Sequence, residues 1–190
     1  MSKIALATLV AGMACTMCIH AQALSLPQEL RTSMPGASLA GQAKMTYWGF
    51  DVYHATLWVA PGFAETDLAR STFALELAYL RELKGADIAK RSIAEMQRQG
   101  PVARDLAERW EAQMRTLFPN VKAGDRITGL HQAEQGAVFW CNGVLLGEIR
   151  DPAFAKLFFG IWLAPQTSEP AMRTALLAQA KAGVSPANTP

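Results

Sequence analysis

The chain has 190 residues, and its 18 basic and 16 acidic side chains give a formal net charge of +2. A charge so near neutrality excludes a protein that binds nucleic acid by general electrostatic attraction. The length predicts one domain with a single hydrophobic core.

Residues 1–23 show the three-part pattern of a cleaved secretory signal peptide. Lys3 supplies a positive charge, an uncharged apolar run follows, and Ala21-Gln22-Ala23 offers the small residues that a signal peptidase reads before Leu24. The apolar run is short for a membrane span, so cleavage is favoured over a retained N-terminal anchor. We expect an exported, periplasmic protein with no transmembrane segment after signal cleavage.

Cysteine and histidine usage gives no sign of a disulfide or a metal site. Cys15 and Cys18 would leave with the signal, so Cys141 would be the only thiol and no intramolecular disulfide could form. His54 and His131 are far apart in the sequence and lack the short spacing of metal ligands. We therefore expect neither a metal nor another cofactor.

The predicted domain covers residues 24–181, and the Pro-, Ala- and Ser-containing segment 182–190 is expected to be a flexible tail. A mixed segment over residues 24–41 leads into the first strand. Predicted strands and helices then alternate in groups: strands, two helices, strands, two helices. They cover residues 44–59, 72–83, 87–99, 102–117, 126–132, 137–141, 144–149, 152–160 and 170–180.

Turn signals set the fold class. Gly49 interrupts the first apolar run, which indicates either two strands with a tight turn or one bent strand. Asn142-Gly143 between two apolar runs is the strongest hairpin signal in the chain. Because consecutive strands are joined by tight turns, the class is α+β, with a mostly antiparallel sheet and helices packed on one face.

Tyr79 and Arg81 are the most informative polar pair. Both fall on the predicted core face of strand 72–83. An inward arginine must reach an anion or solvent, and Arg81 with a Tyr79 hydroxyl could clamp a carboxylate. The alternative is that Arg81 caps the end of the sheet or pairs with an acidic helix residue.

Several blocks of the sequence stand in a characteristic order. They are GFDVYHATLW at 49–58, LAYLR at 77–81, GDRI at 124–127, NG at 142–143, DPAF at 151–154 and FGIWL at 159–163. Together they resemble the bacterial chalcone isomerase-like family over about residues 36–178. The resemblance implies an open-faced β-sandwich, in which a large antiparallel sheet carries a layer of helices and a ligand cleft lies between them.

The resemblance does not carry the plant reaction with it. The tyrosine, lysine and asparagine positions of the plant catalytic helix align with Ile88, Arg91 and Glu95. The catalytic threonine position falls near Tyr53 and the arginine position near Lys44. Since most of this polar set has changed, flavonoid isomerase activity is not expected, and no catalytic residues are assigned.

Non-catalytic relatives of this fold bind fatty acids in the same cleft, with an arginine and a tyrosine on the carboxylate. The resemblance therefore implies an amphipathic carboxylate ligand, held by Tyr79 and Arg81 or by Tyr53 and Lys44.

Two alternatives stay open. The first is an isomerase or intramolecular lyase on a non-flavonoid substrate, with Lys44, Tyr53 or Glu95 converging in acid/base roles. The second is a ligand-free interaction protein, which predicts a filled interface between the sheet and the helices.

Overall fold

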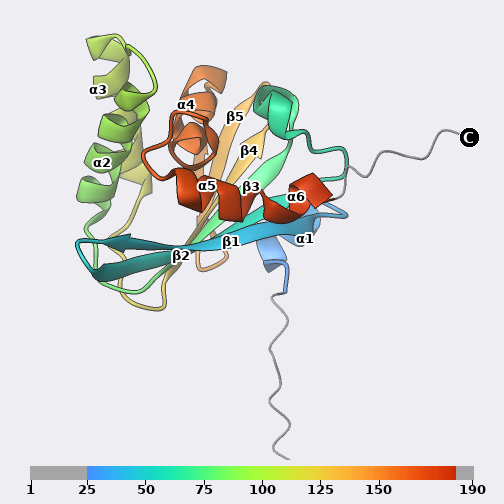
Figure 1. Cartoon of the computed structure of the whole chain (residues 1–190). Coiled ribbons are helices and arrows are strands. Elements are labelled where there is room, and N and C mark those ends of the chain that lie inside the picture. The colour runs from blue at the N-terminus through green and yellow to red at the C-terminus, as the bar shows by residue number, and fades with distance from the viewer. Residues whose placement is uncertain (1–24, 183–190) are drawn as a thin grey trace, which may run out of the picture.

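The computed structural model describes residues 25–182, so the predicted signal peptide and the residues from 183 onward lie outside the described part. Its centre is a six-stranded antiparallel sheet in which the strands neighbour one another in chain order (Figure 1). The strands are β1 Ser38–Tyr47, β2 Phe50–Val59, β3 Phe73–Tyr79, β4 Arg126–Gln132, β5 Gly136–Cys141 and β6 Val144–Ile149. The predicted α+β class is confirmed, and the run 44–59 contains two strands rather than one bent strand.

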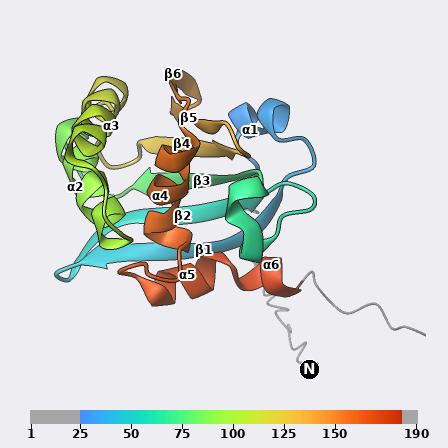
Figure 2. The same cartoon turned by 90° about the horizontal axis from the view of Figure 1, so that it is seen from above.

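Helices form the second layer. The helices α2 Gly85–Arg98, α3 Arg104–Leu117 and α4 Pro152–Leu163 belong to the layer on one face of the sheet, while α5 Pro170–Leu176 and α6 Ala178–Ala182 run along β1 (Figure 2). A short 3-10 segment, η1 Glu65–Arg70, connects β2 to β3. Gly41 allows α5 to lie close, because a Cβ there would collide with the carbonyl oxygens of Ala175 and Leu176.

The main core fills the space between the sheet and α4. Phe73 and Phe139 from the strands make edge-to-face contacts with Phe159 and Phe154 of α4, with ring centroids 5.3 and 6.4 Å apart. All four rings are buried. Alternation along the strands places these side chains on one face, as the sequence pattern predicts.

Asp151 fixes the start of α4. Its Oδ1 accepts hydrogen bonds from the backbone N–H groups of Ala153 and Phe154, which is an N-cap followed by proline at the first helical position. Its Oδ2 accepts a hydrogen bond of 2.9 Å from the Trp110 indole of α3. One carboxylate therefore ties α3 to the beginning of α4.

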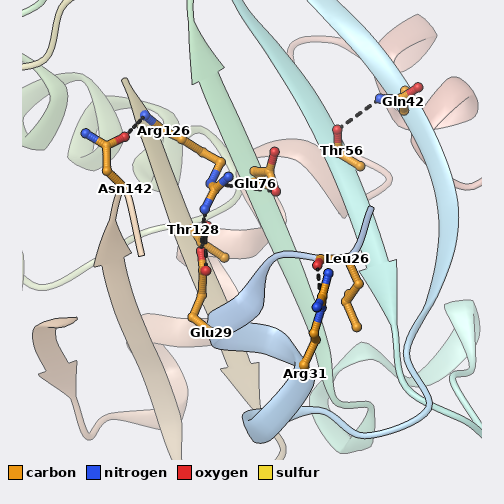
Figure 3. Close-up of polar contacts among 9 residues, drawn as sticks. All are labelled: Leu26, Glu29, Arg31, Gln42, Thr56, Glu76, Arg126, Thr128 and Asn142. Atoms are coloured by element: carbon orange, nitrogen blue, oxygen red, sulfur yellow. Dashed lines mark hydrogen bonds and ion pairs between the residues drawn. The ribbon is translucent and has the colours of Figure 1, made fainter. Parts of the chain in front are cut away.

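One short helix, which the sequence did not predict, lies on the opposite face of the sheet. In α1 Gln28–Ser33, Leu30 packs with Met34 just beyond it onto Trp58 and other outward side chains of β2 to β5. Glu29 accepts hydrogen bonds from Arg126 and Thr128 of β4 at 3.1 and 2.9 Å (Figure 3). The helix has only six residues, too few for helical periodicity to stand out in the sequence.

Two predicted elements are shorter than expected. β3 ends at Tyr79 rather than continuing to residue 83, and Leu83 makes only an isolated bridge to Val121. Arg81 therefore follows the strand and is exposed. The predicted helix over 170–180 is two helices, α5 and α6, with Leu177 between them.

Candidate functional site

A cavity of about 320 Å³ lies between the inner face of strands β1 to β4 and helices α2 and α4. This volume is near the lower end of the range of about 300–1,000 Å³ that small-molecule sites occupy. Most of the wall is apolar, and it includes Met45, Val52, Leu77, Leu83, Ile88, Phe118, Ile127, Phe158, Ile161 and Trp162. The filled interface expected of a ligand-free interaction protein is therefore absent at this place.

Two tyrosines stand side by side in the wall. Tyr53 of β2 pairs in register with Tyr79 of β3, and their rings meet edge to face with centroids 6.0 Å apart. The Tyr53 hydroxyl accepts a hydrogen bond of 3.0 Å from the Trp162 indole of α4. The Tyr79 side chain is buried, and its hydroxyl makes no hydrogen bond to any residue between 25 and 182.

Both phenols are held in the neutral form. Burial raises the pKa of Tyr53 to about 12, even though the hydrogen bond from Trp162 opposes the shift. Burial also raises the pKa of Tyr79, and the neighbouring Tyr53 adds to that effect. Each hydroxyl can therefore donate a hydrogen bond into the cavity at neutral pH, as carboxylate recognition would need.

Two arginines lie where the cavity meets the β1–β2 hairpin. The Arg81 guanidinium is 5.4 Å from the centroid of the Phe50 ring, and in residues 25–182 no carboxylate lies within ion-pair distance of it. The Arg91 guanidinium is 5.7 Å from the centroid of the Tyr47 ring. Arg91 also forms an ion pair of 2.6 Å with Glu95, so Arg81 has the less engaged charge.

Glu95 is a buried carboxylate in the cavity wall. Besides Arg91, Arg98 approaches it at 3.5 Å and the Ser168 hydroxyl donates a hydrogen bond of 2.9 Å to it. These contacts join α2 to the segment before α5. We interpret a carboxylate held by three partners first as a structural anchor. To act as a general base on a ligand, Glu95 would have to give up some of those contacts.

The structure brings together three of the four predicted ligand residues. Tyr53, Tyr79 and Arg81 all line the cavity, whereas Lys44 does not. Lys44 points to the other face of β1 from Met45 and forms an ion pair of 2.8 Å with Asp51. Lys44 therefore does not converge with Tyr53 and Glu95 on this cavity, because side-chain alternation sends its ammonium group outward.

Three positions aligned with the plant catalytic helix do face the cavity. Ile88, Arg91 and Glu95 line it from one side of α2. Trp162 was not among the predicted site residues, although its indole orients the Tyr53 hydroxyl from 109 positions away. Its signals in the sequence were its place in the block at 159–163 and the abundance of tryptophan, five residues in the chain, which could line an apolar pocket.

Over residues 25–182, no three histidine, cysteine, aspartate or glutamate side chains gather to hold a metal ion. Within the same residues, no helix is both long and apolar enough to cross a membrane.

An antiparallel sheet with a helical layer defines an open-faced β-sandwich, and an apolar cavity lies between its two layers. A sequence profile described as chalcone isomerase-like matches residues 20–178, and the chain belongs to that family.

A solved structure shares the fold. The fatty-acid binding protein AtFAP1 of Arabidopsis thaliana superposes with a TM-score of 0.59 at 11% sequence identity, covering 75% of this chain and 87% of its own. Among curated proteins, no match to this chain reaches significance. At this identity the likeness to AtFAP1 concerns the fold.

Proposed function

We propose that this protein binds an amphipathic carboxylate of the fatty-acid type, with the hydrocarbon tail in the cavity and the carboxylate near Tyr79 and Arg81. The observation that carries the proposal is the cavity itself, which combines apolar walls, two neutral tyrosine hydroxyls and an arginine without a carboxylate partner among the described residues. The fold shared with the fatty-acid binding protein AtFAP1 supports the same ligand class.

The chemistry of each part matches one part of the ligand. Burial of a methylene group is worth about 0.8 kcal/mol, so an apolar wall favours a long tail. Hydrogen bonds to a charged group are worth about 1.5–3 kcal/mol, so Tyr79 and Arg81 favour an ionised head. Tyr53 is already oriented by Trp162 and can donate its own proton toward the same space.

The test is isothermal titration calorimetry, in which saturated carboxylates of increasing chain length are titrated into the protein. Affinity should rise about fourfold per methylene until the cavity is full, and the matching alcohols should bind more weakly. Arg81→Ala should weaken carboxylate binding, while Arg104→Ala on the exposed face of α3 serves as the matched control. Equal affinity for acids and alcohols, or no binding at any length, would refute the proposal.

We also propose that the protein acts in the periplasm, on the pattern of residues 1–23. Cell fractionation with N-terminal sequencing tests this. A periplasmic product that begins at or near Leu24 is expected, and a full-length cytoplasmic product would contradict it.

A further inference from the structure

The β1–β2 hairpin ends in an exposed aromatic tip, made of Tyr47, Trp48 and Phe50. Their side chains are 49%, 86% and 64% exposed, although each is large and apolar. Three such residues in a stretch of four form a patch that an ordinary solvated turn does not need. Trp48 takes no part in the cavity wall.

The backbone geometry of the β1–β2 turn makes Trp48 an unexpected residue at its position. Trp48 and Gly49 have φ values of 51° and 79°, which almost repeat the 51° and 83° of Asn142 and Gly143. Such two-residue turns favour Asn-Gly, because both residues adopt the left-handed conformation. A bulky side chain there is disfavoured.

The two turns differ in what their first residue does for the fold. At β5–β6, the Asn142 side chain accepts a hydrogen bond of 2.8 Å from the Arg126 N–H and donates one of 3.0 Å to Asp125. At β1–β2, the Trp48 ring meets only the neighbouring Tyr47 ring among the described aromatic side chains. The fold therefore gives no reason for a tryptophan at this position, which points to a contact outside the domain.

Cations flank the aromatic tip. Arg81 lies over Phe50 and Arg91 over Tyr47, and Arg81 has no carboxylate partner within the described residues. The nearby Asp51 is neutralised by Lys44, although Asp87 also faces the cavity. Tryptophan and tyrosine favour the headgroup level of a bilayer, and arginine forms forked hydrogen bonds with phosphate.

We propose that the aromatic tip docks this protein on an anionic phospholipid surface. Tyr47, Arg81 and Arg91 belong to both the tip region and the cavity wall, so docking places the cavity against the lipid. The docking inference stands on the exposed tip. Its consequence, that the cavity takes up its ligand from the surface, rests on the proposed function.

The test is sedimentation of the chain beginning at Leu24 with lipid vesicles, because the apolar run of residues 1–23 would itself bind lipid. One set of vesicles contains phosphatidylglycerol and phosphatidylethanolamine in equal parts, and the other contains phosphatidylcholine alone. We expect at least about tenfold tighter binding to the anionic set, weakening as salt screens the charges.

Trp48→Asn separates docking from folding. It converts the turn to the Asn-Gly sequence that the geometry favours, so its thermal midpoint should equal or exceed that of the wild type. Its affinity for anionic vesicles should fall about tenfold or more, because an exposed indole no longer enters the interface. Leu145→Ser is the matched control, since it removes a side chain that is 60% exposed from the hairpin at the other edge of the sheet.

Several results would overturn the inference: no vesicle binding by the wild type, equal binding to both lipid sets, or unchanged binding by Trp48→Asn. The wild type could also self-associate without binding vesicles. If Trp48→Asn abolished that self-association, the tip would instead be assigned to contact with a second copy of the chain. Trp48→Asn should keep its affinity for a dissolved fatty acid. If the wild type docks on vesicles but binds no fatty acid, the proposed function fails while docking stands.

Discussion

Removal of the Tyr79 hydroxyl should affect ligand binding without affecting the fold. Tyr79→Phe deletes a group that faces the cavity and makes no hydrogen bond to the residues in 25–182. Since no intramolecular hydrogen bond is lost, the free energy of unfolding without ligand should change by less than about 0.5 kcal/mol. A carboxylate that accepts a hydrogen bond from Tyr79 would lose about 1.5–3 kcal/mol, or about 10- to 150-fold in affinity.

Tyr53→Phe is the contrasting variant, because it removes the same group from a neighbouring ring with a different consequence. The Trp162 indole N–H then loses its acceptor in a buried position. An unsatisfied buried donor costs about 1–3 kcal/mol, so this variant should unfold at a lower denaturant concentration. The ratio of the loss of affinity to the loss of stability should therefore be smaller for Tyr53→Phe than for Tyr79→Phe.

Urea denaturation followed by circular dichroism gives the stabilities, and isothermal titration calorimetry with a saturated fatty acid gives the affinities. The reasoning would be refuted if Tyr79→Phe were destabilised as much as Tyr53→Phe while binding the ligand like the wild type. In that case the Tyr79 hydroxyl would belong to the core and not to the site.

Three further predictions concern the cap, the pH dependence and the cavity volume. Asp151→Ala should lose about 1 kcal/mol of capping energy and leave the buried Trp110 N–H unsatisfied at about 1–3 kcal/mol more; a total loss below 1 kcal/mol in urea denaturation would contradict this. Burial lowers the pKa of His131 below 6.5, despite its hydrogen bond with the Ser71 carbonyl. The contribution of neutral His131 to stability should therefore be fully present above pH 6.5. It should be lost as the pH drops through the pKa of His131 in the folded state. His131→Asn should flatten this decline, and an unchanged pH slope would exclude His131 as its source. Ile88→Trp should fill part of the cavity and weaken fatty-acid binding at least about tenfold, with a thermal midpoint near that of the wild type; undiminished affinity would place the ligand elsewhere.

The local patterns predicted much of the sheet. The strands at 126–132 and 144–149 occur with the predicted bounds, because alternation and the Asn142-Gly143 turn fix them within a few residues. The helices α2 and α3 begin two residues from their predicted starts. Such features depend on neighbours in sequence, which a single sequence displays directly.

Features that depend on distant contacts were not predictable in the same way. The start of β1 at Ser38 was not predicted, because its first residues are small and mixed in polarity. Only their pairing with β2 identifies them as a strand. Prediction of α1 would have required knowledge of the outer sheet face that it covers. The place of Arg81 beside the cavity depended on the end of β3 at Tyr79, after which only Leu83 makes an isolated bridge to Val121.

The candidate site was predicted in part for the same reason. Alternation placed Tyr79 on the predicted core face, whereas Tyr53 was included through its approximate alignment to a family position. The register of β2 and β3 sets the two residues opposite each other. The contact between Tyr53 and Trp162 joins segments separated by most of the domain. Lys44 was included through its approximate alignment to a family position, although its neighbour Met45 is the residue that faces the cavity.

The most direct test of the account is mass spectrometry of small molecules extracted from the protein purified from its native cells, beside the Ile88→Trp variant. We expect a fatty acid or related amphipathic carboxylate at stoichiometric yield from the wild type and a strong depletion in the variant. A wild type that carries no such molecule and takes none up when incubated with fatty acids, or equal yields from both proteins, would contradict the assignment of the cavity as its binding site.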